Sequence, residues 1–504
     1  MHVPGNASKS KSHRTRIRRR KPLSRFRTQV PDELVDQLIG RLLSLVARGL
    51  ELLLKEPSEI AQQWRKEHPD AWFEAKQVPY ILLWVAMLAW KTDLEGLPEH
   101  LDDKVRALLG PDFVWDPVRL EGEFARLHPR VVELAIHDAL KEGDKEDRRP
   151  PEERPTPQEE YEEAIGVAEL LKLFKRRVRP FLKQMDRQDR SSRVGAPRDY
   201  RTRSFLSADM IRWLLRLRST EEMRRWLKRY PFLAGAVNFQ PGQIPDKSTF
   251  SRRRPLIPFP TLLEMFHALV EALAKMGVIS GQALIIDLTA LQTYSNVAKE
   301  LKRKPEERSD PQARFRGFNA ADGLIQYGYN IIIVVDFKTE LPMAFLFVGG
   351  NEHDAPHAVP ALEQAEREHP TVVARSEFVF ADGNYDAVNI FRHILQQIGA
   401  LPIITKNPRN AADPETDLLT DELCVLDRKG LIHKALFRTR TGVERTNSRI
   451  KLDFNLKYHK NRGFAAVRLC AITACLCLLA VAVVAMDTGH PDKIRRPITW
   501  VMPL

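Results

Sequence analysis

Apolar residues follow a helical spacing through the first half of the chain. Leu and Val recur every three or four positions in 32–54, and the same spacing continues to about residue 140. A second helical stretch is expected from 165 to about 280. Because residues three or four apart lie on one face of a helix, each stretch can bury an apolar face. We therefore expect mainly α-helical regions before residue 281.

After residue 281 the pattern changes to short apolar runs that alternate with helices. The runs expected to form strands are 283–291, 329–337, 341–350, 377–383 and 400–406. A tight turn at Lys338-Thr339-Glu340 joins the second run to the third, and a long helix is expected from about Thr439. Three strands in a meander, then helix, strand, helix, strand and helix, is the order of an α/β RNase H-like domain, with a mixed five-stranded sheet and flanking helices. Many activities occur on such sheets, so this order alone does not define a function.

Composition marks the boundaries between these regions. Residues 141–164 are charged, rich in proline and nearly free of large apolar side chains, so they are expected to form a linker. The expected organisation, in chain order, is a basic tail (1–31), a helical domain (32–140), the linker, a basic helical DNA-binding region (165–280), the RNase H-like domain (281–486) and a carboxy-terminal tail (487–504).

One apolar run is long enough to raise the question of a membrane. In residues 469–486 the only polar side chain is Thr473, and the run is at the lower limit of length for a membrane span. It is rich in Ala and Cys, which are easily buried but favour insertion weakly. We interpret it as a helix buried in the protein core, with a membrane-anchored protein as the alternative.

Net charge narrows the classes of partner. The 504 residues include 79 Lys and Arg against 66 Asp and Glu, and the formal net charge of +13 favours nucleic acid or an anionic membrane surface. Ten of these cations lie in 9–27, before the first acid, Asp32. This segment is either a solvated tail or an arm that follows DNA phosphates. The 4 cysteines argue against a disulfide scaffold and suit a reducing cytoplasm.

A second basic segment, 212–254, is a candidate for DNA contacts. It holds eleven Lys and Arg against three acids, with aromatic residues among them. Ser219 is expected to cap one short helix and Asp246 another, and Arg252 lies on the second. The two helices would form either a helix-turn-helix that presents the second helix to DNA, or a basic surface that packs on the next domain.

Two acids, Asp287 and Asp382, lie at strand positions that would suit a catalytic or ligand-binding site. Asp287 is in the middle of an apolar strand, where a carboxylate is costly unless it is paired, hydrogen-bonded or bound to a cation. A satisfied or partly exposed acid is the alternative. Asp382 lies at the carboxyl end of the fourth strand, where open α/β sheets bind ligands, although Asp-Gly is also a common turn.

A third acid, Glu444, lies on the last predicted helix. Arg440 precedes it by four residues, and Asn447 and Lys451 follow it by three and seven. This spacing places the four side chains on one polar stripe. An ordinary Arg–Glu pair on a solvated face would give the same pattern.

Together the three acids indicate a site for hard divalent ions. Carboxylate oxygens bind Mg²⁺ or Mn²⁺ and leave positions open for water and phosphate. Two such ions about 4 Å apart can activate the attacking oxygen and stabilise the leaving oxygen in phosphodiester displacement. The sequence has no HExxH motif, no glycine-rich phosphate loop, and no zinc-ligand spacing at Cys475 and Cys477.

In this order and context the three acids resemble the DDE triad of bacterial insertion-sequence transposases. The resemblance extends to that family's Tyr-x2-Arg-x3-Glu-x6-Lys signature, which Arg440, Glu444 and Lys451 match, with Phe437 at the tyrosine position. The motifs GNEHD and STFSR are also similar to motifs of the family. The resemblance covers about 244–485.

The resemblance implies a DNA transposase with an RNase H-like catalytic domain. Asp287 and Asp382 would bridge two Mg²⁺ or Mn²⁺ ions, and Glu444 would hold one of them. Water would cut a transposon end, and the freed 3′-hydroxyl would attack target DNA. The implied partners are terminal inverted repeats, target DNA and a second copy of the chain in a synaptic dimer, in the bacterial cytoplasm at the nucleoid and without a membrane. The residues expected to contact DNA are Arg252, Arg440, Lys451, Lys457 and Lys460.

A second hypothesis keeps the fold without the catalysis. A domesticated or decayed transposase would bind DNA and not cut it. The complete set of acids favours an active enzyme, and Phe437 in place of tyrosine leaves the inactive alternative open.

Overall fold

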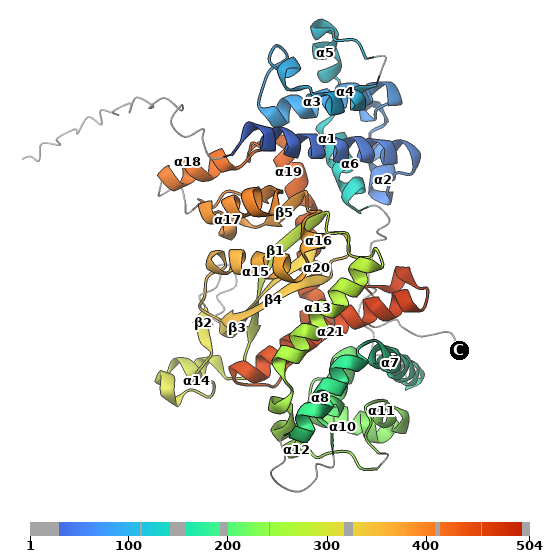
Figure 1. The fold of residues 1–504 in the computed structure, drawn as a ribbon, viewed down its shortest axis with the longest axis vertical. Coiled ribbons are helices and arrows are strands. Elements are labelled where there is room, and N and C mark those ends of the chain that lie inside the picture. Colours follow the sequence, from blue (N-terminus) through green and yellow to red (C-terminus); the bar gives the residue numbers. More distant parts are fainter. Residues whose placement is uncertain are drawn as a thin grey trace, which may run out of the picture.

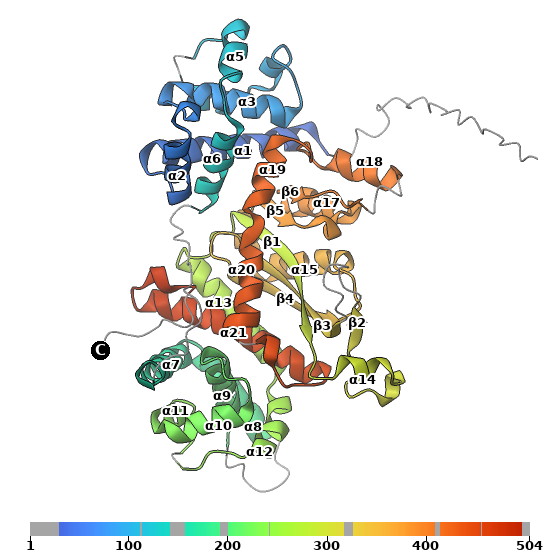
Figure 2. The same cartoon turned by 180° about the vertical axis from the view of Figure 1, so that it is seen from behind.

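The protein has three parts that follow one another along its long axis (Figure 1). The computed structural model describes residues 30–110, 113–141, 157–191, 200–240, 242–316, 326–408, 414–454 and 456–495. Helices before residue 142 lie at one end, helices of 157–253 lie at the other, and a sheet lies between them (Figures 1 and 2). The basic segment 9–27 lies outside the described residues.

One mixed sheet of six strands is found in the described part of the chain. The strands are β1 Ala283–Gln292, β2 Arg314–Arg316, β3 Gln326–Asp336, β4 Pro342–Gly349, β5 Phe378–Ala381 and β6 Leu401–Ile404. Their order is β2-β3-β1-β5-β6, and β4 also pairs with β3. β3 is antiparallel to β1 and β4, whereas β5 is parallel to β1 and β6. This arrangement confirms the predicted RNase H-like fold. The short strand β2 adds to the five predicted strands, because three residues carry too little apolar pattern to predict it.

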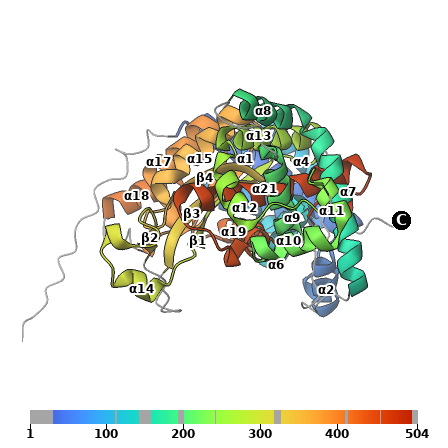
Figure 3. The ribbon, with the colours of Figure 1, turned by 90° about the horizontal axis from the view of Figure 1, so that it is seen from below.

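Helices cover the two faces of this sheet. α15 (Ala355–Glu368) packs against β3 and β4, and α17 (Val388–His393) lies beside it. On the other face α19 (Leu431–Arg438) packs on β6 and α20 (Gly442–Ser448) packs on β1 (Figure 2). The shorter helices around the sheet are α14 Val297–Leu301, α16 Pro370–Val373 and α18 Pro414–Leu423. α14 and β2 lie on the side of the molecule away from α7 (Figure 3).

The helix expected from about Thr439 is shorter than predicted and is interrupted. Thr439–Thr441 form a 3₁₀ turn, α20 begins only at Gly442, and Arg449–Asp453 form a π-helical turn. The sequence GVERTNS contains several residues with low helix propensity. Such a short helix is marginal by itself, so contacts with the sheet must stabilise it.

Helices before residue 142 form the first end of the molecule. They are α1 Asp32–Lys55, α2 Glu59–Glu67, α3 Val78–Trp90, α4 Asp103–Leu109, α5 Pro117–Phe124 and α6 Pro129–Lys141. α1 packs against α3 and α6, and its apolar stripe is buried between them. Contacts of α19 with α3 and α6 join this part to the sheet region.

The second helical part begins earlier than the predicted boundary. Its helices are α7 Pro157–Arg177, α8 Arg179–Ser191, α9 Thr202–Leu214, α10 Thr220–Arg229, α11 Pro231–Ala236 and α12 Lys247–Arg253, followed by α13 Phe259–Lys275. The end of the segment predicted as a linker, 157–164, is therefore helical, and 142–156 lie outside the described residues. Glu159 and Glu160 stand in the first turn of α7, where acids favour a helix start, and Ala164 is already buried.

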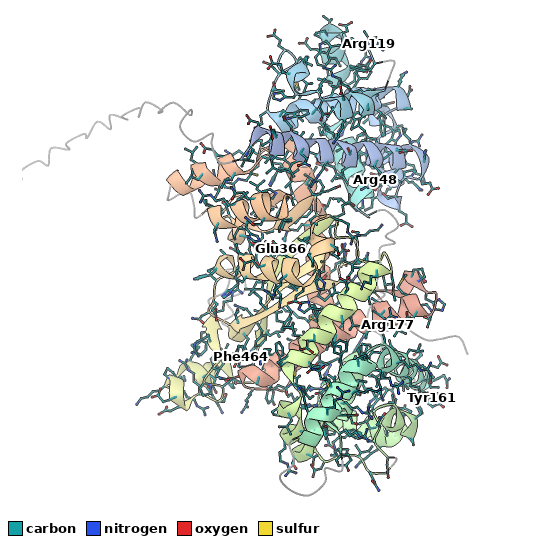
Figure 4. All side chains as sticks on the ribbon, viewed as in Figure 1. Arg48, Arg119, Tyr161, Arg177, Glu366 and Phe464 are labelled. Atoms are coloured by element: carbon teal, nitrogen blue, oxygen red, sulfur yellow. The ribbon has the colours of Figure 1, made fainter. Side chains whose placement is uncertain are left out.

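The apolar run 469–486 belongs to α21 (Phe464–Asp487). α21 is long and apolar enough to cross a membrane, but 94% of its most apolar 18-residue window is buried inside the protein. It packs against α7, α9 and α13 and touches β3 and β4. At its end Asp487 lies 4.0 Å from Arg177 of α7, which Figure 4 labels. α21 thus forms a core that joins the second helical part to the sheet.

Candidate active site

Asp287 and Asp382 lie level with each other on neighbouring strands. β1 and β5 are parallel, and Ile285 pairs with Phe380. Two residues further along, the same register places Asp287 beside Asp382, which directly follows β5. Residues at one level of two parallel strands point to the same face. The sheet therefore brings these two predicted site residues together.

α20 brings a third polar element to this place. Nδ2 of Asn447 donates a hydrogen bond to Oδ2 of Asp287 at 2.7 Å. The backbone of Glu444 lies in the same helix, three residues before Asn447 and on the same side. The side chain of Glu444 lies outside the part of the structure that is described. The fold thus places the backbone of the third expected acid next to the strand that carries the first.

A fourth acid, Asp354, belongs to the same cluster. It directly precedes α15 and is buried. Nδ2 of Asn384 donates to Asp354 at 3.2 Å and to Oδ2 of Asp382 at 3.3 Å, and the Asn384 backbone N–H donates to Oδ1 of Asp382 at 2.8 Å. A guanidinium nitrogen of Arg316 lies 3.5 Å from the second oxygen of Asp354. Asn384 therefore links two acids that would otherwise repel each other.

Burial and mutual repulsion perturb these carboxyl groups. Burial raises the pKa of Asp287 to about 7, Arg440 opposes this rise, and the charges of Asp382 and Asp354 add to it. Burial also raises the pKa of Asp354, again against a nearby cation, Arg316, and with a contribution from Asp382. Crowded carboxyl groups in a buried place are stabilised by a cation or a proton.

The donor atoms at this place fit a hard divalent cation. Two buried atoms beside the acids have no hydrogen-bond partner among the described groups, Oδ1 of Asn447 and the hydroxyl of Tyr385. Burial raises the pKa of Tyr385, and three of the acids contribute to the shift. Oxygen ligands and unpaired oxygen atoms suit Mg²⁺ or Mn²⁺ with bound water. Among the described side chains, a set that excludes Glu444, no three His, Cys, Asp or Glu are placed to hold one ion.

A family comparison agrees with this arrangement. Residues 280–480 match the family described as "Transposase DDE domain". This part of the chain is a transposase DDE domain. The matched range contains Asp287, Asp354, Asp382 and Glu444, and it supports a function in transposition. DNA is the substrate that the family implies, and its members typically use divalent metal ions. No curated protein and no solved structure gives a significant match to the chain.

Two of the expected DNA-binding cations lie near Asp287 in the DDE domain. Arg440 is close enough for its charge to act on the pKa of Asp287. Burial lowers the pKa of Lys451, and the charge of Asp287 works in the opposite direction, so these two groups are also close. Lys457 and Lys460 are exposed on the segment that leads into α21, and Lys457 lies near enough to Lys451 to lower its pKa further.

Arg252 lies in another part of the molecule. It is exposed on α12, among the helices at the end of the molecule opposite α1 (Figure 1), and no described contact links it to the acids. Three other cations of the surrounding basic segment make contacts inside the helical part. Arg212 is 2% exposed, Arg253 donates to the Tyr200 carbonyl at 2.8 Å, and Arg254 donates to Asp209 at 2.8 Å. These cations stabilise the helical part from within.

Both predicted helix caps in this basic segment are present. Ser219 accepts a hydrogen bond from the Glu222 backbone N–H at 3.1 Å, and Asp246 accepts one from Thr249 at 2.6 Å. Glu222 does not complete a capping box, because its carboxylate accepts from the Arg218 backbone N–H at 2.7 Å.

Sequence reasoning missed several residues of the DDE domain site. Asn384 and Tyr385 directly follow Asp382, so the tight turn after β5 was a usable signal for both. Asp354 is the last residue of GNEHD, a motif that was noted only for its similarity to the transposase family and not as a source of a carboxylate. Asn447 stood on the predicted polar stripe without a role.

Proposed function

We propose that this protein is an active DNA transposase that cuts transposon ends and joins them to target DNA. The observation that carries the proposal is the juxtaposition of Asp287 and Asp382 at one level of the sheet, inside a region that matches the transposase DDE family. The hydrogen bond from Asn447 to Asp287 supports a place for Glu444 beside them, because both residues lie on one side of α20.

The chain's own residues would hold and orient the reacting groups. Asp287, Asp382 and Glu444 would ligate two Mg²⁺ or Mn²⁺ ions. Such ions, when bound, activate the attacking oxygen and stabilise the leaving oxygen of a phosphodiester. Asn447 and Asn384 would keep the two aspartates in place through hydrogen bonds that the structure already contains.

Cations around the acids would hold the DNA backbone. Arg440 and Lys451, both within reach of the charge on Asp287, would bind the phosphates beside the cut. Lys457 and Lys460, which are exposed, would extend this contact along the strand, and Arg252 would serve the terminal inverted repeats from the helical part. We also propose a homodimer in the synaptic complex, in the bacterial cytoplasm at the nucleoid and without a membrane.

Asp287→Asn tests the proposal against the inactive alternative. The substrate is a plasmid that carries the coding sequence with its flanking DNA. We expect the unchanged chain to nick this plasmid at the ends of the element with Mg²⁺ or Mn²⁺ and not with EDTA. Asp287→Asn should abolish nicking and leave DNA binding within about twofold, since the amide keeps the shape and loses the charge. DNA binding without nicking by the unchanged chain would favour a catalytically inactive derivative of a transposase.

A further inference from the structure

A buried glutamate, Glu340, packs against α20, the helix that carries Glu444. Glu340 is 0% exposed and sits in the turn between β3 and β4, with a φ of 59° that side-chain-bearing residues rarely adopt. Asp336 holds the turn, because its carboxylate accepts hydrogen bonds from the Thr339 backbone N–H at 2.9 Å and from its hydroxyl at 2.7 Å. The Gly281 backbone N–H also donates to Asp336 at 2.9 Å. The position of Glu340 is thus fixed by the sheet.

Residues of α20 and of the π-helical turn after it converge on Glu340. Nε of Arg445 donates to Oε1 of Glu340 at 2.7 Å, and a guanidinium nitrogen of Arg449 donates to Oε2 at 2.6 Å. The hydroxyl of Thr446 donates to the Glu340 backbone carbonyl at 2.8 Å. Both carboxylate oxygens and the carbonyl of Glu340 therefore bind three residues of this helical segment, at positions 445, 446 and 449.

The start of α20 packs closely on the same glutamate. A Cβ added at Gly442 would lie 3.3 Å from Cγ of Glu340 and 3.5 Å from Cδ1 of Ile285. Gly442, Arg445 and Arg449 follow a spacing of three and four residues, so they share one side of the helical segment. This side faces the turn, while the neighbouring side, with Asn447, faces Asp287.

These contacts matter because α20 has little stability of its own. It has seven residues, with a 3₁₀ turn before it and a π-helical turn after it. A helix of that length does not form alone in water. Hydrogen bonds between a carboxylate and guanidinium groups are also strongly directional. Because Glu340 is buried, the loss of one partner would leave a charge without compensation. The pose of α20 over β1 is therefore set where Arg445 and Arg449 meet Glu340.

We propose that Glu340 is a positioning residue for the DDE site, which fixes the rotation and depth of α20 so that Asn447 faces Asp287 and the backbone of Glu444 lies beside the same strand. The inference rests on the proposed function only in taking Glu444 as a metal ligand. Glu340 is not a ligand of substrate or metal, and it acts through Arg445, Thr446 and Arg449.

Hydrogen exchange tests the positioning without any need for activity. In Glu340→Asp, which keeps the charge and shortens the side chain, we expect backbone exchange in 442–453 to rise at least tenfold. Exchange in β1 and β3 should stay within about twofold. Arg445→Lys, at the more exposed of the two arginines, should have the same effect to a smaller degree, and it serves if Glu340→Asp does not fold. Unchanged exchange in 442–453 in a folded variant would overturn the proposal.

Asp209→Asn is the matched control for the loss of a buried carboxylate–arginine contact. Asp209 is 5% exposed and pairs with Arg254 in the helical part, away from β1. This variant should lower the thermal midpoint and leave exchange in 442–453 unchanged. A rise in that segment equal to the rise in Glu340→Asp would mean general destabilisation and would overturn the proposal.

Metal dependence of DNA cleavage separates this inference from the proposed function. Glu340→Asp should need at least tenfold more Mg²⁺ for half-maximal nicking per folded molecule, with part of the rate restored by Mn²⁺, whereas Asp209→Asn should keep the Mg²⁺ requirement of the unchanged chain. If the unchanged chain never nicks DNA, the proposed function fails and the exchange measurement still decides the positioning. If the unchanged chain nicks DNA and Glu340→Asp has the same Mg²⁺ requirement, the role of Glu340 fails alone.

Discussion

Asn447 donates a hydrogen bond to Asp287 across 160 residues of sequence, and this contact joins α20 to the central strand of the sheet. Asp287 accepts this bond through Oδ2, and Oδ1 of Asn447 has no hydrogen-bond partner among the described groups. An asparagine in this position orients a carboxylate and adds no charge to a place already crowded with acids.

Asn447→Ala should therefore lower DNA nicking by about 10- to 100-fold, the usual cost of removing a group that orients a metal ligand. DNA binding should change less than about twofold, because no phosphate contact is removed. Plasmid nicking and a filter-binding assay on the same preparation would measure both. Asn389→Ala, at an exposed position of α17, is the control and should behave like the unchanged chain.

Asp354→Asn should raise the Mg²⁺ concentration needed for half-maximal nicking by about tenfold. Asp354 shares Asn384 with Asp382, so loss of its charge reduces the attraction of the cluster for a cation. A Mg²⁺ titration of initial nicking rates would show the shift. If neither the Mg²⁺ titration nor the nicking rate changed, the ion pair of Asp354 with Arg316 would be structural and Asp354 would have no effect on metal binding.

The sheet and its acids could be predicted because their signals are local. Apolar runs marked five strands, with Asp287 in the middle of the first and Asp382 at the carboxyl end of the fourth, and the register of β1 with β5 then brings the two acids level. Glu340 could not be found in this way, because in sequence it is one residue of a polar turn, and its burial depends on Arg445 and Arg449 more than a hundred residues later. The pairing of buried charges is tertiary, and local pattern does not reveal it.

Two further features of the structure were not predicted, one in the basic helical part and one in the last helix. Arg254 donates a hydrogen bond to Asp209 of α9, a tertiary contact that the sequence pattern does not reveal. The stripe from Arg440 to Lys451 assumed a regular α-helix, whereas the segment changes to a π-helical turn at Arg449. Lys451 nevertheless stays close to Asp287.

Lys451→Ala should weaken DNA binding and lower the salt slope of log K against log salt by about one unit. The reason is that one fewer phosphate contact releases one fewer counterion. Binding to a fixed duplex at several salt concentrations would measure the slope. Lys434→Ala removes an exposed lysine on α19 and should keep the original slope. An unchanged slope in Lys451→Ala would place Lys451 off the DNA.

His433 should make the protein less stable in mild acid. Burial and, to a smaller degree, the charge of Arg428 lower the pKa of His433 to about 4, against a backbone contact with Ile404 and the charge of Asp427. The unfolded chain binds a proton near the ordinary value of about 6.5, and the folded chain does so only near 4. The stabilising contribution is therefore complete above about pH 7 and is lost as pH falls from there towards 4.

Between pH 8 and pH 5 this one group should cost about 2 kcal/mol of stability. His433→Gln keeps a polar side chain without the titration, so its urea midpoint should fall less over that range than the midpoint of the unchanged chain. His68→Gln, at an exposed position, should follow the unchanged chain at both pH values. Because His267 and His459 are also buried with a lowered pKa, His433→Gln should retain part of the acid sensitivity. If the urea midpoint fell equally in His433→Gln and in the unchanged chain, His433 would bind its proton as readily in the folded chain as in the unfolded chain, and this prediction would be wrong.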